Sequence, residues 1–209
     1  MAAMSIGLAD IRAALALPPR GAGSDHDLNA HLGPAPGAPR DASVLCPLVA
    51  RRDGLHVVLT VRARHLRHHA GQISFPGGKV EPDDPSPLAA ALREAEEETG
   101  LAPALVDVIG PLDPYGTVTG FSILPFVGLV DPRWEPVPDP SEVDEVFECP
   151  LDYLMDPSNC RRDHYDRAGR RRYFYAMPYR HYYIWGATAG MLKGLSDRLA
   201  LHRMGAADA

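Results

Sequence analysis

A run of glutamates is the first feature of the sequence that suggests chemistry. The stretch LREAEEETGL, residues 92–101, holds four glutamates within five positions and then reaches a glycine. At about 100° per residue, Glu94, Glu97 and Glu98 fall on one arc of a helix. The fourth, Glu96, points away from them. Carboxylates stacked in this way repel one another, and the C-terminal half of a helix disfavours anions. The cluster is therefore either a solvated acidic face or a group that holds a cation.

The loop in front of this helix favours the cation. Residues 75–84, FPGGKVEPDD, bring two adjacent glycines, Gly77 and Gly78, which allow close backbone approach. Hard ions such as Mg²⁺ bind carboxylate oxygens together with the phosphates of a substrate. Arg93, four residues before Glu97, is placed to pair with it and to fix its rotamer. The glycine loop and the carboxylates together predict a divalent-metal site.

The loop and the helix together resemble the Nudix box, the motif of the Nudix hydrolases. That motif is a glycine, five residues, a glutamate, seven residues, and then Arg-Glu, an apolar residue, any residue, Glu-Glu, any residue, a glycine and an apolar residue. Its second half is matched at every fixed position by Arg93, Glu94, Ala95, Glu97, Glu98, Gly100 and Leu101. The first half carries one inserted residue, and Asp84 stands six residues after Gly78, where the motif has a glutamate. Whether Asp84 serves as a ligand is left open.

A second resemblance lies upstream, in LTVRARHLRHHAGQISFPGG, residues 59–78. This stretch is similar to a pattern of the coenzyme A pyrophosphatase branch of the Nudix hydrolases, which tends to carry the same inserted residue. The matching positions are Leu59, Thr60, Arg62, Leu66, Arg67, His69, Gly71, Gln72, Phe75, Pro76, Gly77 and Gly78. The segments EVDEVFECPLDYL, residues 142–154, and IWGATAGML, residues 184–192, also resemble later parts of this branch. The resemblance covers about residues 43–200.

The resemblance implies a fold, an activity and a cofactor. The fold is α/β of the α+β type, the Nudix fold, with a curved mixed β-sheet sandwiched between α-helices. The activity is metal-dependent hydrolysis of the diphosphate bond of coenzyme A or acyl-coenzyme A, which yields 3′,5′-ADP and 4′-phosphopantetheine or its acyl form. The cofactor is Mg²⁺ or Mn²⁺, with Glu94 and Glu98 as the preferred ligands. Glu97 is either a further ligand or the catalytic base.

Five residues are candidates for binding the substrate: Arg62, Arg67, His69, Gln72 and Gly78. Arg62 and Arg67 suit bidentate binding of phosphate, and coenzyme A carries a 3′-phosphate besides its diphosphate. His69 suits a hydrogen bond to phosphate, whereas Gln72 either orients the loop or contacts the substrate. The same stretch also fits a solvated basic edge, an interpretation that the family resemblance disfavours.

Two further groups of residues have alternative interpretations. We expect Glu142 and Glu145 to have a solvated or capping role rather than to contribute to the metal site. We expect core packing, rather than stacking on adenine, for the aromatic residues Tyr182, Tyr183 and Trp185.

Composition limits the partners and the location of the protein. The chain has 209 residues and a net charge of −6, so charge predicts no general affinity for nucleic acid. Its three cysteines lack metal-ligand spacing and are expected to be reduced thiols. No apolar run approaches the ~20 residues of a membrane span, and no secretory signal is recognised. We expect a cytoplasmic protein with a small-molecule substrate and no membrane partner, and homo-oligomers stay open.

The chain is predicted to form one domain with flanking segments. Residues 1–40 are expected to hold a helix over 5–16 and then a Pro/Gly/Ala-rich linker or surface tail. Residues 41–204 form the Nudix hydrolase domain, and residues 205–209 form a tail. Within the domain a hairpin is expected to turn at RRDG, residues 51–54.

The helix that carries the glutamates has clear end signals. Ser86 suits its N-cap, Pro87 its first position and Gly100 the residue after its end. Its predicted core face consists of Leu88, Ala91, Leu92, Ala95 and Thr99. Elsewhere strands outnumber helices without regular alternation, which favours a mixed α/β sandwich over a doubly wound parallel sheet.

Two other functions stay open from the sequence. One is a Nudix hydrolase for another nucleoside diphosphate derivative, such as ADP-ribose, a dinucleotide or a nucleotide-capped RNA end. The other is a non-catalytic nucleotide-binding regulator. Such a regulator is expected to lose a glutamate of the box, whereas this chain keeps Glu94, Glu97 and Glu98.

Overall fold

The computed structural model describes residues 5–32, 37–167 and 169–207. The remaining parts of the predicted N-terminal segment and of the predicted tail lie outside the described residues. No helix within the described part of the chain is long and apolar enough to cross a membrane.

The described part of the chain consists of helices of 4 to 21 residues and a larger number of strands. The helices are α1 Leu8–Ala16, α2 Asp25–Leu28, α3 Pro87–Thr99, α4 Leu151–Met155 and α5 Ala187–Ala207, with 3₁₀ turns at Ala30–Leu32, Pro103–Leu105 and Pro157–Asn159. The strands are β1 Gly23–Ser24, β2 Arg40–Arg51, β3 Gly54–Arg62, β4 Ile73–Ser74, β5 Gly77–Lys79, β6 Val106–Pro111, β7 Tyr115–Gly116, β8 Phe121–Val130, β9 Val143–Pro150, β10 Arg161–Arg167, β11 Arg170–Tyr179 and β12 Tyr182–Trp185.

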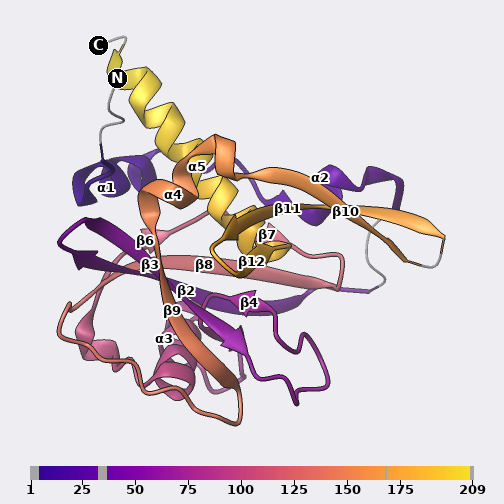
Figure 1. Ribbon diagram of the computed structural model, residues 1–209, viewed down its shortest axis with the longest axis horizontal. Coiled ribbons are helices and arrows are strands. Elements are labelled where there is room, and N and C mark those ends of the chain that lie inside the picture. Colours follow the sequence, from indigo (N-terminus) through magenta and orange to yellow (C-terminus); the bar gives the residue numbers. More distant parts are fainter. Residues whose placement is uncertain (1–4, 33–36, 168, 208–209) are drawn as a thin grey trace.

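A mixed sheet forms the centre of the fold (Figure 1). Its strands run in the order β1-β7-β8-β2-β3-β4, while β5, β6 and β9 pair with β2, β8 and β3 respectively. β2 pairs in parallel with β8 and in antiparallel with β3, and the predicted turn at 51–54 closes the β2–β3 hairpin. A separate antiparallel sheet, β10-β11-β12, lies over one face of the main sheet. The predicted mixed sheet between helices is confirmed.

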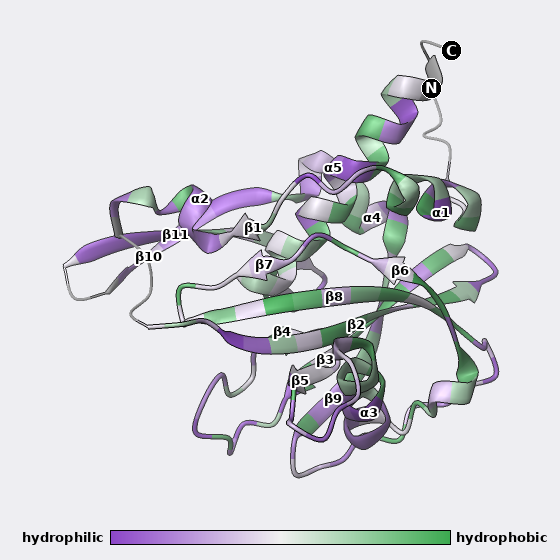
Figure 2. Cartoon of the chain, turned by 180° about the vertical axis from the view of Figure 1, so that it is seen from behind, coloured by the Kyte–Doolittle hydropathy of each residue, from purple (hydrophilic) through white to green (hydrophobic). Residues whose placement is uncertain are grey.

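Helices cover both faces of the main sheet, so its central strands are buried on both sides. α3 packs against one face, and α1, α4 and α5 lie over the other. β2 is buried from Ala42 to Val49, and Figure 2 shows that β2 and β8 are largely hydrophobic. Two apolar cores therefore flank the sheet, one beneath α3 and one beneath α5.

The N-terminal helix is an integral part of the second core. The helix predicted over 5–16 forms as α1, and its Ile11 and Ala14 are buried where α1 packs on α5. Buried Arg198 of α5 donates hydrogen bonds to the carbonyls at the end of α1, among them that of Ala14 at 3.1 Å. α5 itself continues to Ala207, so the first residues of the predicted tail are helical.

The segment after α1 is not the surface tail that its composition suggests. β1 pairs with β7 in parallel, and α2 follows at once. The buried amide of Asn29 donates to the carbonyls of Asp25 and Tyr173 and accepts from the Tyr173 N–H. Residues 23–32 are therefore tied to β11, because one side-chain amide supplies hydrogen bonds that composition does not reveal.

Candidate active site

Helix α3 displays the glutamates because its ends and its core face are well defined. The Ser86 side chain accepts a hydrogen bond from the Ala89 N–H at 3.1 Å, and Pro87 begins the helix. Gly100 ends it with a φ of 68°, in the left-handed region that favours glycine. The predicted core face is confirmed. Its buried members are Ala91, Ala95 and Thr99, and its partly buried members are Leu88 and Leu92.

Glu98 is buried, which the sequence analysis did not predict when it placed Glu98 on one arc with Glu94 and Glu97. Its side chain is 2% exposed, because β5 packs against α3 and the Gly77 N–H donates to Glu98 Oε2 at 3.2 Å. Arg62 Nη1 lies 3.7 Å from Oε1. Burial raises the pKa of Glu98 to about 8, although the Gly77 hydrogen bond and the Arg62 charge lower it. The neighbours of Glu98 therefore do not fully offset the cost of burying its negative charge.

Gly78 lies directly against the Glu94 carboxylate. A β-carbon at Gly78 would come within 2.5 Å of the Glu94 carboxyl carbon, so a larger residue there would displace the Glu94 carboxylate from this position. A β-carbon at Gly77 would meet the β2 backbone at 2.5 Å, because β5 pairs with β2. Burial raises the pKa of Glu94, against the lowering effect of Arg93. The glycine loop thus brings its backbone against both Glu94 and Glu98.

Arg93 joins the glutamates to Asp84. Its Nη1 lies 3.0 Å from Glu94 Oε1 and 2.9 Å from Glu97 Oε2, so the predicted Arg93–Glu97 pair is present. Its Nε donates to Asp84 Oδ1 at 3.0 Å, and this hydrogen bond lowers the pKa of Asp84. Asp84 therefore contacts Arg93 and orients it. Glu97 lies at the outer edge of the cluster with its side chain 57% exposed, and Glu96 is also exposed.

Negative charge gathers around Glu94 and Glu98. After burial, the charges of neighbouring glutamates raise the pKa of both residues, and Glu142 acts on each of them. Glu142 is exposed, as expected for the solvated role that the sequence favours, and its charge adds to the negative charge around the cluster. Glu145 lies elsewhere and accepts a hydrogen bond from Tyr182 at 2.5 Å.

The donors of this cluster suit a hard divalent ion. Within the described part of the chain, no three His, Cys, Asp or Glu side chains stand close enough together to hold an ion by themselves. Mg²⁺ and Mn²⁺ do not need such a cage, since they complete their coordination with substrate phosphates and water. Glu94 and Glu98 offer carboxylate oxygens, the type of ligand that these ions prefer.

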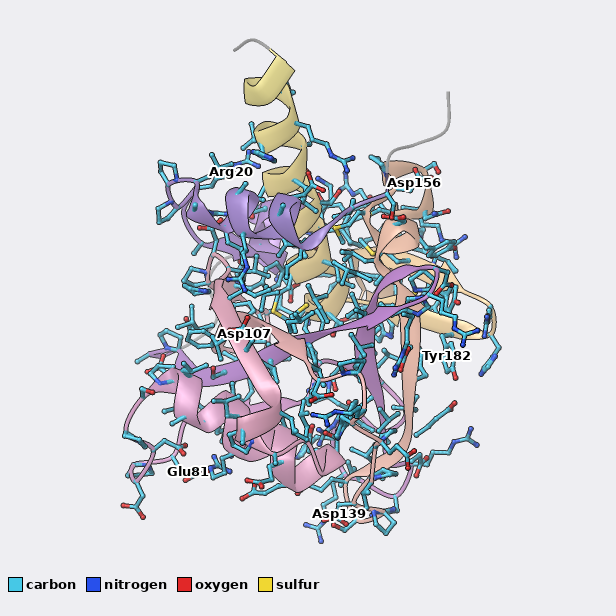
Figure 3. The ribbon with its side chains drawn as sticks, turned by 90° about the vertical axis from the view of Figure 1, so that its left-hand side faces the viewer. Arg20, Glu81, Asp107, Asp139, Asp156 and Tyr182 are labelled. Atoms are coloured by element: carbon cyan, nitrogen blue, oxygen red, sulfur yellow. The ribbon has the colours of Figure 1, made fainter. Side chains whose placement is uncertain are left out.

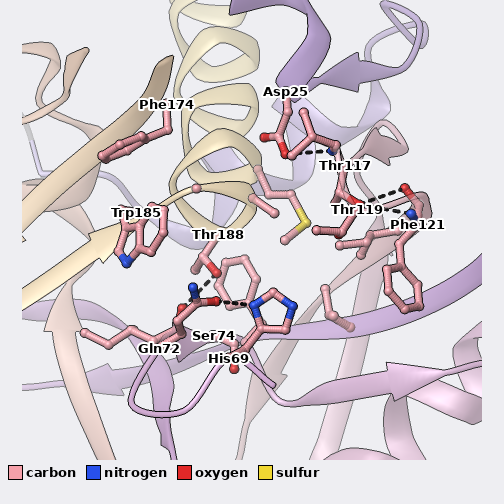
Figure 4. A pocket seen from close by; sticks show the side chains of 18 of the residues that line it. Asp25, His69, Gln72, Ser74, Thr117, Thr119, Phe121, Phe174, Trp185 and Thr188 are labelled. Carbon is pink, nitrogen blue, oxygen red and sulfur yellow. Dashed lines mark hydrogen bonds between the residues drawn. The ribbon is translucent and has the colours of Figure 1, made fainter. Parts of the chain in front are cut away.

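A cavity of about 550 Å³ opens beside these carboxylates. Gly77 and Arg62, which both contact Glu98, line it. The cavity lies between the main sheet, the three-stranded sheet and α5, and Figure 4 shows the side chains that enclose it. Half of the 24 described residues that line it are aromatic or apolar, and ten are polar or charged.

Three of the five predicted substrate-binding residues line this cavity: Arg62, His69 and Gln72. His69 has a φ of 58°, which is unusual for a residue with a side chain, and its Nδ1 lies 2.7 Å from Gln72 Oε1. Gln72 thus orients His69 while it also faces the cavity. Arg67 is exposed and outside the cavity wall, and Gly78 contacts Glu94 instead.

The three aromatic residues for which core packing was expected differ in their surroundings. The Tyr182 ring stacks on Phe147 with centroids 3.6 Å apart, and the Tyr183 hydroxyl donates to Asp163 at 2.6 Å. Trp185, in contrast, lines the cavity. Core packing therefore describes Tyr182 but not Trp185.

The structure adds cavity residues that the sequence analysis did not find. Asp25 from α2 accepts hydrogen bonds from the Tyr115 hydroxyl at 2.8 Å and from the Val118 N–H at 3.1 Å, and burial raises its pKa. Arg172 and Phe174 enter from β11. The alternation of residues 170–179 in a strand could have placed these two on one face, but no local pattern connects α2 to the cavity.

Comparisons with known proteins agree with this architecture. Residues 39–172 match the model of the NUDIX domain. An uncharacterized Nudix hydrolase NudL of Enterobacter sp. (strain 638) is 41% identical over 162 residues, which cover 78% of this chain and 84% of the relative. The protein of the same name from Salmonella paratyphi B is 43% identical over 164 residues, with the same coverage of 78% and 84%.

A solved structure shows the same fold. The NUDIX domain of Shewanella oneidensis NrtR, crystallised with ADP-ribose, superposes with a TM-score of 0.50 at 16% identity. The match covers 83% of this chain and 97% of that chain. The predicted Nudix fold, a mixed sheet between helices, is confirmed.

Proposed function

The chain belongs to the NUDIX family of hydrolases, and from this membership we propose that it hydrolyses the diphosphate bond of coenzyme A or an acyl-coenzyme A. Its substrate, as for a Nudix hydrolase, is a nucleoside diphosphate derivative. The proposed products are 3′,5′-ADP and 4′-phosphopantetheine or its acyl form. The resemblance of residues 59–78 to the coenzyme A pyrophosphatase branch supports this substrate, because Arg62, His69 and Gln72 of that stretch line the cavity.

One observation carries the proposal: the cavity and the carboxylate cluster share a wall. Gly77 and Arg62 line the cavity on one side and contact Glu98 on the other. A nucleotide bound in the cavity can therefore present its diphosphate to Glu94 and Glu98. A volume of about 550 Å³ falls in the range of small-molecule sites.

The reaction is the displacement of one phosphate by water. A water oxygen attacks one phosphorus of the diphosphate, the bridging P–O bond breaks, and the bridging oxygen leaves on the other phosphate. A divalent ion, when bound, neutralises charge on the phosphoryl oxygens. We propose that Glu94 and Glu98 hold that ion and that Arg62 binds the diphosphate from the cavity side. Gly78 allows this arrangement by leaving space for Glu94.

Glu97 is proposed as the base that accepts the proton of the attacking water, or as a third ligand. It shares Arg93 Nη1 with Glu94, so the two carboxylates lie close together. Its side chain is 57% exposed, which leaves it accessible to water at the outer edge of the cluster. Exposure at this edge supports the role of base.

Product analysis tests the proposed substrate. The purified protein is incubated with Mg²⁺, and separately with Mn²⁺, and with coenzyme A, acetyl-coenzyme A, ADP-ribose or NADH. Release of 3′,5′-ADP from coenzyme A or acetyl-coenzyme A at the highest kcat/KM supports the proposal. Faster turnover of ADP-ribose or NADH would instead assign another nucleoside diphosphate derivative, and no turnover with either metal would point to a binding protein.

Two variants of α3 test the carboxylate cluster with the same substrates. Glu98→Gln should lower kcat by about 100-fold, because it removes a ligand charge next to the diphosphate. Glu96→Gln is the matched control, since Glu96 is exposed on the far side of the same helix, and it should keep wild-type kcat. Equal activity of both variants would remove the cluster from the reaction.

A further inference from the structure

The cavity holds an arginine, Arg172, whose role the reaction at the carboxylate cluster does not explain. Among the described residues that line the cavity, the arginines are Arg62 and Arg172. Arg62 lies 3.7 Å from Glu98 Oε1 and so belongs to the diphosphate end. Arg172 enters from β11, on the wall formed by the three-stranded sheet. The two guanidinium groups thus come from different sheets that enclose the cavity.

Arg172 has free hydrogen-bonding capacity. Its backbone belongs to the β10–β11 ladder, but among the described residues its guanidinium forms neither a hydrogen bond nor an ion pair and has only a longer-range electrostatic interaction with Asp25. Its planar guanidinium has five N–H donors in a fork that suits bidentate binding of a phosphate. A partly buried guanidinium without a partner, facing a ligand cavity, is expected to receive an anionic group of the ligand.

Aromatic rings lie beside Arg172 on the same wall. Arg172 and Phe174 are two residues apart on β11 and share one face, and Tyr165 of β10 is the cross-strand partner of Arg172. Phe174 packs against Trp185 with ring centroids 4.8 Å apart and lies 5.9 Å from Tyr165. The wall therefore offers a stacking surface for a base next to a cation for a phosphate.

Asp25 is the acidic residue among the described residues that line the cavity, and it forms no ion pair with the Arg172 guanidinium. Its two carboxylate oxygens already accept hydrogen bonds from Tyr115 and Val118. The charge of Arg172 acts favourably on Asp25 across the cavity, but the two side chains form no ion pair. The N–H groups of Arg172 are therefore not bound by Asp25.

We propose that Arg172 binds the 3′-phosphate of the substrate while the adenine base packs against the aromatic wall of Phe174 and Trp185. This inference rests on the proposed function, since the substrate must carry a phosphomonoester on its ribose. It replaces Arg67, which is exposed and outside the cavity wall, as the residue that recognises this group. Arg172 is thus a specificity-determining residue for 3′-phosphorylated nucleotides.

The test compares coenzyme A with 3′-dephospho-coenzyme A. Wild-type protein should show the higher kcat/KM for coenzyme A, and Arg172→Met should lower that kcat/KM by about 10- to 100-fold, as expected for a charge-assisted hydrogen-bonded pair. The kcat/KM for the dephosphorylated substrate should not change. The ratio of the two values is independent of the folded fraction, because both substrates meet the same protein.

Arg171→Met is the matched control. Arg171 is the neighbour of Arg172 on β11, and its side chain points to the opposite face, where it pairs with Asp166. Its substitution by methionine removes the same charge. It should keep the wild-type ratio. A ratio that Arg172→Met leaves unchanged, or a wild-type protein that does not distinguish the two substrates, would overturn the proposal while the proposed function stands.

A binding measurement separates failure of the subsite from failure of the function. If wild-type protein hydrolyses neither substrate, the proposed function fails, and calorimetric titration with 3′,5′-ADP and 5′-AMP then tests the subsite alone. Tighter binding of 3′,5′-ADP that Arg172→Met abolishes supports the subsite. Equal affinity of wild-type protein for the two nucleotides contradicts it.

Discussion

The Glu94 carboxylate packs against Gly78. A β-carbon at position 78 would lie 2.5 Å from both the carboxyl carbon of Glu94 and one of the Glu94 carboxylate oxygens. This contact explains in physical terms why a glycine precedes the acidic helix. The backbone at that point passes under the side chain of a proposed metal ligand, and any larger residue must push the ligand away.

Replacing Gly78 with alanine should therefore displace Glu94. We expect the apparent affinity for Mg²⁺ to fall by about 10- to 100-fold, as for residues that position a metal ligand, with a smaller effect on folding. Titrating activity against Mg²⁺ concentration measures the change. Gly194→Ala is the control, because a β-carbon at Gly194 in α5 would meet no atom within 4 Å. If Gly78→Ala kept the wild-type dependence of activity on Mg²⁺, the position of Glu94 next to Gly78 would not be needed for metal binding.

Glu98 should make the metal-free protein less stable as pH rises. Its folded-state pKa of about 8 lies above the ordinary value of 4.5, so the folded protein binds the proton more tightly than the unfolded chain. The resulting stabilisation is fully present below about pH 4.5 and is lost as pH rises through about 8. With EDTA present, Glu98→Gln should raise Tm at alkaline pH but not under acid conditions, by about 2–4 °C for each kcal/mol gained.

Metal should reverse this behaviour. Mg²⁺ binds the ionised carboxylate, so it should raise the Tm of wild-type protein more at alkaline pH than at acidic pH, and it should have little effect on Glu98→Gln. Melting curves over the pH range with EDTA or Mg²⁺ measure both effects. Parallel curves for the two proteins in EDTA would contradict the burial of an uncompensated charge at Glu98.

The backbone conformation of His69 should lower the stability of the fold while its side chain supports activity. With a φ of 58° it occupies a backbone region that costs a residue with a side chain about 1 kcal/mol or more. We expect His69→Gly to keep or raise the free energy of unfolding while kcat/KM falls by about 10-fold, because the imidazole no longer reaches the substrate. Chemical denaturation and steady-state kinetics give the two values.

Arg180 offers the matched control for this substitution. It is the other described residue besides glycine with a positive φ, 54°, and it lies in the exposed β11–β12 turn outside the cavity. Arg180→Gly should be as stable as His69→Gly and fully active. Equal losses of activity in the two variants would remove the functional explanation for the His69 backbone.

Asn29 should hold the N-terminal segment onto the domain. Its buried side chain makes three hydrogen bonds, two donated and one accepted, to Asp25 and Tyr173. Asn29→Ala leaves those backbone groups without partners, so we expect a loss of about 2–4 kcal/mol in the free energy of unfolding. Asn159→Ala, which removes one hydrogen bond to the Tyr153 carbonyl, should cost about 1 kcal/mol. Urea denaturation compares the two, and an Asn29→Ala as stable as wild type would mean that residues 23–32 detach freely.

Side chains from several elements are brought together only by the folded chain. Figure 3 shows how densely they fill the space between the helices and the main sheet. Arg62 at the end of β3 and Gly77 at the start of β5 are fifteen positions apart, yet both contact Glu98 on α3. The local sequence predicted each of these elements, but it does not predict that the end of β3 and the start of β5 both contact α3.

The N-terminal segment illustrates the same limit. Its prolines and glycines predict an irregular chain, and that description is correct for much of it. Its attachment depends on the amide of Asn29 and on Asp25, which reaches Tyr115 and Val118 far along the chain. A single polar residue in a flexible stretch has no periodic pattern, so its burial is invisible before the fold is known.

The order of residues alone determined the acidic helix, its ends, its core face and the glycine loop before it, because capping, periodicity and backbone freedom act within a few residues. Family membership followed from the same short stretch. Only the tertiary structure decided that Glu98 is buried, that Asp84 contacts Arg93 and that Arg172 faces the cavity. Burial and long-range electrostatics arise from segments that are distant in sequence, and they exist only when the sheet brings those segments into contact.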